Sequence, residues 1–92
     1  RSGRNIMLID VREPHEWEIC RLKGAEHHPV NRIKTDDFTK DLEKIIVFYC
    51  HRGVRSERTL KIFQDLGYEN CRSLAGGIDA WAEAIEPDMP RY

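Results

Sequence analysis

Cys50 is the residue of this sequence whose surroundings best suit a chemical role. It follows directly on an apolar run, residues 45–49, whose Ile and Val content is typical of a strand buried on both faces. Arg55 and Ser56 come after a short loop, and Ser56 is the predicted N-cap of the helix that follows. Cysteine reacts as its thiolate, which a helix N-terminus and positive side chains stabilise. The stretch therefore predicts anion chemistry at sulfur.

The loop after Cys50 has further features that favour an anion. Arg52 and Arg55 bring positive charge, and backbone amides arranged around one point form an anion-binding nest. Gly53 allows the loop to turn with a positive φ, which a side chain opposes. The alternative is an inert thiol that merely ends a buried strand. The two arginines, the glycine and the start of a helix favour the reactive interpretation.

The number of residues between Cys50 and Arg55 separates two chemistries. A tetrahedral phosphate carries three non-bridging oxygens and needs a wide cradle, whereas sulfane sulfur is a single atom and fits a tighter loop. Four residues intervene here, one fewer than in cysteine phosphatases. The spacing therefore favours sulfane sulfur over phosphate.

A second apolar run, residues 6–10, predicts a buried strand that leads into a short helix. Pro14 suits the first turn of that helix, and Glu13 and Glu16 favour its N-terminus. Gly24 is the predicted stop. The side chains expected to face the core are Trp17 with either Ile19 or Cys20.

The middle of the chain is weakly patterned. Residues 25–30 predict a short strand that ends before Pro29, and the charged residues 31–44 predict one short helix or turn over the sheet. The apolar anchors of this second segment are Ile33, Phe38 and Leu42.

Two more strand–helix pairs complete the predicted pattern. The helix after Ser56 is expected to end at Gly67, and a short strand is expected around residues 71–74. Residues 75–77 predict a tight turn, and its glycines suggest no function of their own. The apolar stripes of the two helices are Leu60, Phe63 and Leu66 in the first, and Ile78, Trp81, Ala82 and Ile85 in the last. Trp17 and Trp81 are interpreted as core residues rather than ligand platforms.

This alternation of strands and helices predicts an α/β fold with a parallel sheet and helices on both faces. Ligands of such sheets bind beyond the carboxyl ends of the strands. Residues 10–12 and 50–55 both follow strand ends, so we expect them to meet at one edge. The first strand begins so early that the chain is expected to be trimmed at its N-terminus or to follow another domain.

Composition narrows the class of protein. The chain has 92 residues, 40% of them hydrophobic and 34% charged, which suits one domain with one core. A net charge of −1 without a basic block gives no reason to expect nucleic-acid binding. No apolar run approaches the about 20 residues of a membrane span, and no signal-peptide pattern opens the chain. We therefore expect a cytoplasmic protein that binds neither membrane nor nucleic acid.

The spacing of cysteines and histidines predicts no metal site. Cys20, Cys50 and Cys71 lack the paired spacing of zinc ligands, and their odd number argues against a disulfide framework. His27 and His28 are adjacent, so their rings diverge on a strand. We expect no metal and no cofactor, and we interpret Cys20 and Cys71 as ordinary reduced thiols.

Four motifs along the chain are similar to those of one known family: residues 8–16 (LIDVREPHE), 23–25 (KGA), 50–56 (CHRGVRS) and 74–81 (LAGGIDAW). The chain resembles the single-domain rhodaneses, a sulfurtransferase family, over almost its full length. The resemblance implies a three-layer rhodanese-like fold, with a parallel central sheet of about four or five short strands flanked by helices. Residues 86–92 also resemble the tail of rhodanese domains fused behind adenylyltransferases of molybdopterin and thiamine biosynthesis.

The resemblance implies a double-displacement reaction at Cys50. The Cys50 thiolate would attack the outer sulfur of a donor such as thiosulfate or a persulfide, leaving a persulfide on the enzyme. A thiol, cyanide or an activated sulfur-carrier protein would then accept that sulfur. No cofactor is implied.

The resemblance also implies roles for the residues around Cys50. Arg55 would stabilise the loop and bind the anion, and a salt bridge to Asp10 or Glu13 is a compatible alternative. Ser56 would cap the helix, donate a hydrogen bond to the persulfide, or do both. The expected persulfide-binding loop consists of His51, Arg52, Gly53, Val54, Arg55 and Ser56. Within it, His51 and Arg52 either recognise the donor or acceptor or are simply solvated.

Asp10 and Arg12 are expected to brace the loop from the neighbouring strand end rather than to react. Two departures from the family are visible. The family usually has a glycine where Cys20 stands, so the end of the first helix is expected to differ in detail. The first strand and helix typical of the family are at most hinted at by residues 1–5.

Two other functions are compatible with parts of the sequence. A non-catalytic interaction or regulatory module would keep the fold, although such modules often lack the cysteine or the loop arginine, and both are present here. A cysteine phosphatase or arsenate reductase is the other alternative, and the loop spacing opposes it.

Overall fold

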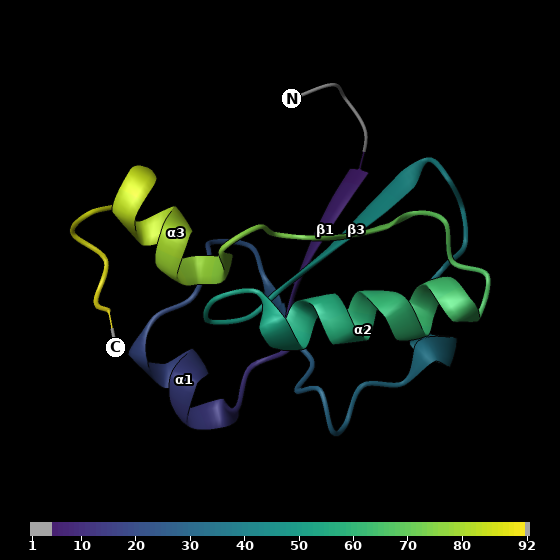
Figure 1. The fold of residues 1–92 in the computed structure, drawn as a ribbon, viewed down its shortest axis with the longest axis horizontal. Helices are drawn as coiled ribbons and strands as arrows, with labels where there is room; N and C mark the ends of the chain where they lie inside the picture. Colours follow the sequence, from purple (N-terminus) through teal and green to yellow (C-terminus); the bar gives the residue numbers. More distant parts are fainter. Residues whose placement is uncertain (1–4, 92) are drawn as a thin grey trace.

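A four-stranded parallel sheet forms the centre of the computed structural model, which describes residues 5–91 (Figure 1). The strand order is β2-β1-β3-β4, and every neighbouring pair is parallel. The strands are β1 (Asn5–Asp10), β2 (Glu26–His27), β3 (Lys44–Tyr49) and β4 (Cys71–Ser73). The helices are α1 (Pro14–Ile19), α2 (Val54–Asp65) and α3 (Gly77–Ala84), with a 3-10 turn, η1 (Thr35–Asp37). The predicted α/β fold with a parallel sheet flanked by helices is confirmed.

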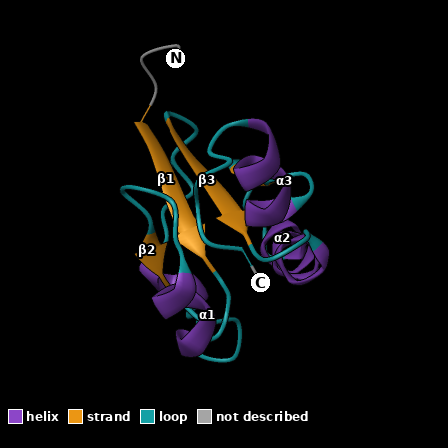
Figure 2. Cartoon of the chain, turned by 90° about the vertical axis from the view of Figure 1, so that its left-hand side faces the viewer, coloured by secondary structure: helices purple, strands orange, loops and turns teal. Residues whose placement is uncertain are grey.

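The two central strands, β1 and β3, pair along their whole length, from Asn5 opposite Lys44 to Asp10 opposite Tyr49. Their carboxyl ends therefore lie at the same edge of the sheet, and Figure 2 shows both arrowheads pointing the same way. Residues 10–12 and the loop after Cys50 consequently leave the sheet side by side, as the topology predicts.

Side chains of successive residues in β3 point to opposite faces of the sheet, and each face has its own core. On one face, Phe48 packs with Phe63 of α2 and with Phe38, which follows η1. On the other face, Tyr49 packs with Ile78 of α3. Because Tyr49 and Cys50 follow each other, both cores converge on the end of β3.

The structure corrects the prediction for α1. This helix ends at Ile19, before the predicted stop at Gly24, because Cys20 is already extended, with φ −164°. The expected apolar side is confirmed only in part. Ile19 is exposed and the buried residue within α1 is Glu16, but Cys20, the alternative to Ile19, is partly buried against the core around Tyr49. Trp17 is half-buried and stacks on His27, with ring centroids 4.8 Å apart. A carboxylate on the inner side of α1 indicates that this helix covers polar groups rather than the apolar core.

The boundaries of α2 differ from the prediction at one end and agree at the other. Gly53, with φ 107°, is the N-cap, so Ser56 lies inside the first turn and is not the cap. At the other end, the N–H groups of Gly67 and Tyr68 donate to Gln64 and Phe63 carbonyls at 3.0 Å each, which is a Schellman motif. Gly67 therefore ends the helix as predicted.

Several predicted apolar anchors prove to be exposed. Leu42 lies in the turn before β3, Leu66 caps α2 at its end, and Ile85 follows the last turn of α3. Each of them lies at the margin of its segment, where no second layer covers it. Phe38, Phe63, Ile78 and Ala82 are buried as expected, and Ile33, Leu60 and Trp81 are partly buried.

Within residues 5–91, no helix has the length and apolar character needed to cross a membrane. The sequence hint of a further N-terminal strand and helix falls mostly on residues 1–4, which lie outside the described part of the chain.

Candidate functional site

The sulfur of Cys50 lies at the carboxyl end of β3, one residue beyond the last strand pair. The N–H of Val11 donates to the Tyr49 carbonyl at 3.0 Å, which keeps the two chain segments together past the sheet. Cys50 is only 1% exposed. It nevertheless lines an open pocket of about 450 Å³, together with His51, Arg52, Val54 and Arg55. The structure therefore brings together most of the loop residues that the sequence singled out.

The loop folds around the sulfur by means of Gly53. Its positive φ turns the chain so that its own N–H donates to Cys50 Sγ at 3.1 Å, as expected for a glycine at this position. Ser56 Oγ lies 3.6 Å from Cys50 Sγ and also donates to the Gly53 carbonyl at 3.2 Å. Ser56 does not cap α2, because the αL turn at Gly53 begins the helix earlier and leaves the Ser56 hydroxyl facing the sulfur.

Two opposing effects act on the pKa of Cys50. Burial raises the pKa, but hydrogen bonds from the amide and hydroxyl of Ser56 and from the amides of Gly53 and Arg55 outweigh it, and the net pKa is lowered. By contrast, burial raises the pKa of Cys71 to about 11. The loop thus favours a thiolate at Cys50, and the donors are chiefly backbone amides at the start of α2.

Arg55 forms a two-point ion pair with Glu16 of α1. Its two terminal nitrogens lie 2.6 and 2.8 Å from the Glu16 carboxylate oxygens, in a largely buried contact. The expected partners, Asp10 and Glu13, are therefore wrong, because α1 turns Glu16 toward the loop. Such paired hydrogen bonds fix geometry as well as energy. Arg55 fastens the loop to α1, and Glu16 offsets much of its positive charge.

Asp10 and Arg12 form a fully buried ion pair beneath α1. Arg12 donates to Asp10 through Nε at 2.9 Å and through a terminal nitrogen at 2.6 Å, and it also donates to the Cys20 carbonyl at 2.5 Å. His27 Nε2 lies 2.8 Å from the Arg12 carbonyl oxygen. Neither Asp10 nor Arg12 lines the pocket at Cys50. They hold the end of α1 in place. Because α1 carries Glu16, they also help to position the ion pair between Glu16 and Arg55 of the loop.

The N-terminus of α3 supports the loop from its other side, a contact that the sequence did not predict. The N–H groups of Ile78 and Asp79 donate to the carbonyls of Cys50 and His51 at 2.9 and 3.0 Å. A Cβ on Gly77 would collide with those same two carbonyl oxygens. The paired glycines at the start of α3 are the sequence signal for this close approach, and interpreting them as a plain turn misses it.

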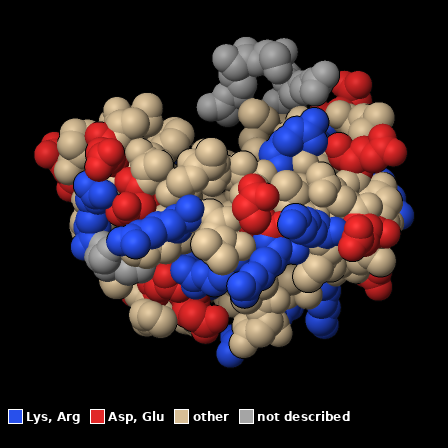
Figure 3. Space-filling view, viewed as in Figure 1, with Lys and Arg blue, Asp and Glu red and all other residues tan. Residues whose placement is uncertain are grey.

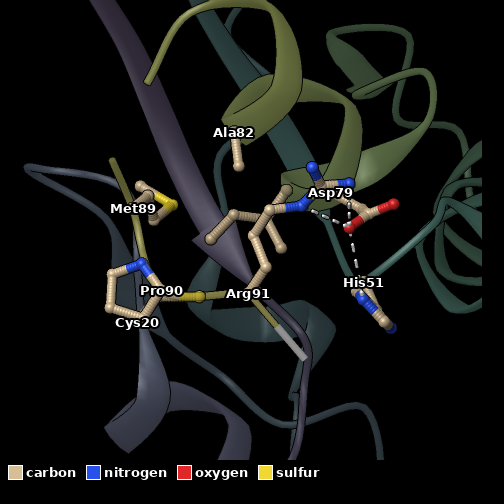
Figure 4. A pocket seen from close by; sticks show the side chains of 8 residues that line it. Cys20, His51, Asp79, Ala82, Met89, Pro90 and Arg91 are labelled. Carbon is tan, nitrogen blue, oxygen red and sulfur yellow. Dashed lines mark hydrogen bonds and ion pairs between the residues drawn. The ribbon is translucent and has the colours of Figure 1, made fainter. Parts of the chain in front are cut away.

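His51 lines the Cys50 pocket and also lies beside a small group of charged side chains, Asp79 and Arg91 (Figure 4). Its Nε2 lies 3.7 Å from Asp79 Oδ1, and Arg91 donates to the same oxygen at 3.0 Å. The Arg91 hydrogen bond is the main cause that lowers the pKa of Asp79. Cys20 lines this second pocket and does not line the pocket of Cys50.

Arg52 is exposed at the mouth of the Cys50 pocket, and Arg58 lies nearby along α2. Figure 3 shows Lys and Arg side chains in an interrupted band across this side of the molecule, with Asp and Glu on both sides of it. The three cysteines are free, and among residues 5–91 no group of His, Cys, Asp and Glu side chains is arranged to hold a metal ion.

This geometry agrees with the comparison to known families. The sequence profile of the rhodanese-like domain family matches residues 1–84 of the chain. The chain belongs to the rhodanese-like domain family. The family resemblance seen in the four sequence motifs is thereby confirmed.

Relatives of this rhodanese-like domain include proteins that are named as sulfurtransferases. The chain is 40% identical over 93 residues to the probable adenylyltransferase/sulfurtransferase MoeZ of Mycobacterium tuberculosis, a match that covers 99% of this chain and 24% of that protein. It is 34% identical to the adenylyltransferase and sulfurtransferase uba4 of Ogataea parapolymorpha, with the same coverage of 99% and 24%. The chain thus spans about a quarter of the length of these relatives.

A solved structure shares the fold of this rhodanese-like domain. The rhodanese-related protein of Thermoplasma volcanium superposes with a TM-score of 0.78 at 28% identity, covering 89% of this chain and 81% of that one.

The lowered pKa of Cys50 predicts that its reactivity persists below the pH at which an ordinary thiol, with a pKa of about 8.5, is protonated. The rate of iodoacetamide modification of Cys50 should fall only as the pH drops through the lowered pKa. Peptide mapping of the labelled protein at a series of pH values measures this rate for Cys50. A midpoint at or above that of a free cysteine would contradict the conclusion that the loop amides lower the pKa of Cys50.

Gly77→Ala should displace the loop and slow this modification by about 10–100-fold, because the new Cβ meets the Cys50 and His51 carbonyls. Gly24→Ala is the matched control. Gly24 has a similar positive φ of 82°, but nothing lies within 4 Å of the added Cβ. It should cost about 1–2 kcal/mol of stability and leave the rate unchanged. Equal rates for the two variants would show that α3 does not support the loop.

Proposed function

We propose that this domain is a sulfurtransferase that carries sulfane sulfur as a persulfide on Cys50. The observation that supports it most directly is the arrangement around the sulfur. Gly53 N–H donates to Cys50 Sγ at 3.1 Å, and Ser56 Oγ lies 3.6 Å away, in a loop that is anchored on two sides. Such a loop favours an ionised nucleophile without a separate general base.

The first half-reaction charges the cysteine. The Cys50 thiolate attacks the outer sulfur of thiosulfate or of a persulfide, and a new S–S bond forms while the old one breaks. With thiosulfate as donor, the electron pair of the broken bond leaves with sulfite. The product is an anionic persulfide, Cys50–S–S⁻, so no oxidant or cofactor is needed.

The loop that favours the thiolate also suits the persulfide anion. The negative charge moves outward by one sulfur atom, into the open pocket and toward the amides at the start of α2. Hydrogen-bond donors that are already in place stabilise such a charge without any reorganisation of the loop. The helix N-terminus adds a favourable electrostatic contribution. Val54, Arg52 and His51 line the pocket through which a donor or acceptor would approach the sulfur.

The second half-reaction discharges the persulfide. A thiolate or cyanide attacks the outer sulfur, and Cys50 leaves as the thiolate. With the activated carboxylate of a sulfur-carrier protein, the persulfide instead attacks the carbonyl carbon, expels the activating group and forms an acyl disulfide. A thiol then cleaves that disulfide at Cys50 Sγ and releases the thiocarboxylate, and a second thiol reduces the remaining disulfide to restore the Cys50 thiolate. The open pocket admits an acceptor of this kind, and His51 and Arg52 are placed to contact it. The relatives named adenylyltransferase and sulfurtransferase support a carrier-protein acceptor. A reducing compartment, the cytoplasm, suits a thiol-dependent cycle of this type.

A non-catalytic interaction module and a cysteine phosphatase are less well supported. A module has no need for the hydrogen bonds that lower the pKa of Cys50. The four-residue loop holds its Gly53 amide against the sulfur itself, which leaves little width for a phosphate cradle.

Thiosulfate treatment should add one sulfur atom, about 32 Da, to Cys50, with release of one equivalent of sulfite. Intact mass spectrometry with peptide mapping measures the adduct. Cys50→Ser should abolish both the adduct and the sulfite.

Cys20→Ser is the control, because Cys20 lies outside the Cys50 pocket. It should keep the adduct at Cys50. Persulfide in the Cys50→Ser protein, or hydrolysis of an aryl phosphate by the wild type, would overturn the proposed function.

A further inference from the structure

Ser73, the last residue of β4, brings a second hydroxyl to the group around the sulfur. Its Oγ lies 2.7 Å from Ser56 Oγ, which in turn lies 3.6 Å from Cys50 Sγ. Ser56 Oγ is also 3.2 Å from the Gly53 carbonyl oxygen. A line of two hydroxyls thus runs from β4 across to the first turn of α2 and ends at sulfur.

Each hydroxyl has one proton, so the direction of this line matters. The Ser56 proton has three acceptors within reach: the sulfur, the Gly53 carbonyl and Ser73 Oγ. If Ser56 donates to Ser73, the sulfur loses the Ser56 hydroxyl as a donor. If Ser73 donates to Ser56, the Ser56 proton remains available for the sulfur. A charged acceptor makes the stronger hydrogen bond, so ionisation of Cys50 favours the second arrangement.

We propose that Ser73 is a positioning residue that donates to Ser56 and thereby directs the Ser56 hydroxyl proton onto the ionised sulfur of Cys50. The proposal deepens the proposed function and rests on it, because a directed proton would hold both the thiolate and the persulfide in place. Hydrogen bonds in series polarise one another, so the outer hydroxyl strengthens the bond made by the inner one.

The side chain of Ser73 is not needed to place β4 in the sheet. Ser73 pairs with Phe48 through the backbone, and the N–H of Leu74 donates to the Phe48 carbonyl at 2.9 Å. The register of β4 is therefore set by main-chain hydrogen bonds. What the hydroxyl adds is its contact with Ser56.

A Ser73 substitution leaves in place the charged groups of the Cys50 loop and of the elements packed around that loop. Those on the loop, on α1, at the end of β1 and on α3 are His51, Arg52, Arg55, Glu16, Asp10, Arg12 and Asp79. Since none of these changes, a change in the titration of Cys50 in a Ser73 variant reports on the hydroxyl line.

The test follows the ionisation of Cys50 by thiolate absorbance and by the rate of iodoacetamide modification against pH. Ser73→Ala should raise the midpoint by about 0.5–1 pH unit, which is a threefold to tenfold slower modification at a pH below both midpoints. Ser73→Thr keeps the hydroxyl and should restore the wild-type midpoint. Thr59→Val is the matched control, because the Thr59 hydroxyl donates to the Arg55 carbonyl at 2.9 Å on the same helix. It should leave the midpoint unchanged.

A double-mutant cycle tests whether Ser73 acts through Ser56. In a Ser56→Ala background, Ser73→Ala should cause no further shift of the midpoint. An unshifted midpoint in Ser73→Ala, or an equal shift in Ser73→Thr, would reduce Ser73 to a packing residue and overturn the proposal. If Ser73→Ala fails to fold, the similarly shaped pair Ser73→Thr and Ser73→Val gives the same comparison of hydroxyl with methyl.

The titration and the persulfide assay separate the two proposals. A wild-type protein that forms the Cys50 persulfide but shows no effect of Ser73→Ala retains the proposed function and contradicts the role of Ser73. A protein that shows the Ser73 effect but never forms the persulfide contradicts the proposed function alone.

Discussion

The structure depends on one balance of forces, which is the cost of burying a charged sulfur against the hydrogen bonds that offset it. Cys50 is 1% exposed, and burial by itself raises its pKa. The amides of Gly53, Arg55 and Ser56 reverse the effect because the loop turns them inward. They do so only while the loop keeps its shape, since hydrogen bonds weaken steeply with distance and angle. The rest of the fold is arranged to preserve that shape.

Three elements hold the loop, each with a different interaction. The helix α1 contributes the Glu16–Arg55 ion pair, and the Asp10–Arg12 pair in turn fixes the end of α1. The helix α3 contributes two backbone N–H groups to the loop carbonyls, at a point where Gly77 leaves room for them. Strand β4 contributes a hydroxyl. Because these supports come from separate parts of the chain, the loop geometry is a property of the whole domain rather than of the motif alone.

The sequence predicts best what depends on local pattern. The apolar runs before Asp10 and Cys50 identify β1 and β3, and the need for a positive φ identifies Gly53 as the turn residue. The contacts that a side chain makes in the folded protein are harder to predict from the sequence. Ser56 looks like a cap, and only the αL turn at Gly53 shows that the helix has already begun. The partner of Arg55 lies 39 residues away among several carboxylates, and nothing local to Arg55 singles out Glu16.

We infer that the loop is already shaped for a persulfide before the sulfur arrives. A crystal structure of the protein after reaction with thiosulfate tests this claim most directly. We expect one additional sulfur bonded to Cys50 Sγ, within hydrogen-bond distance of the amides of residues 51–56, while the loop backbone moves by less than about 1 Å. A loop that rearranges to receive the sulfur, or a sulfur bound to Cys20 or Cys71 instead, would contradict it.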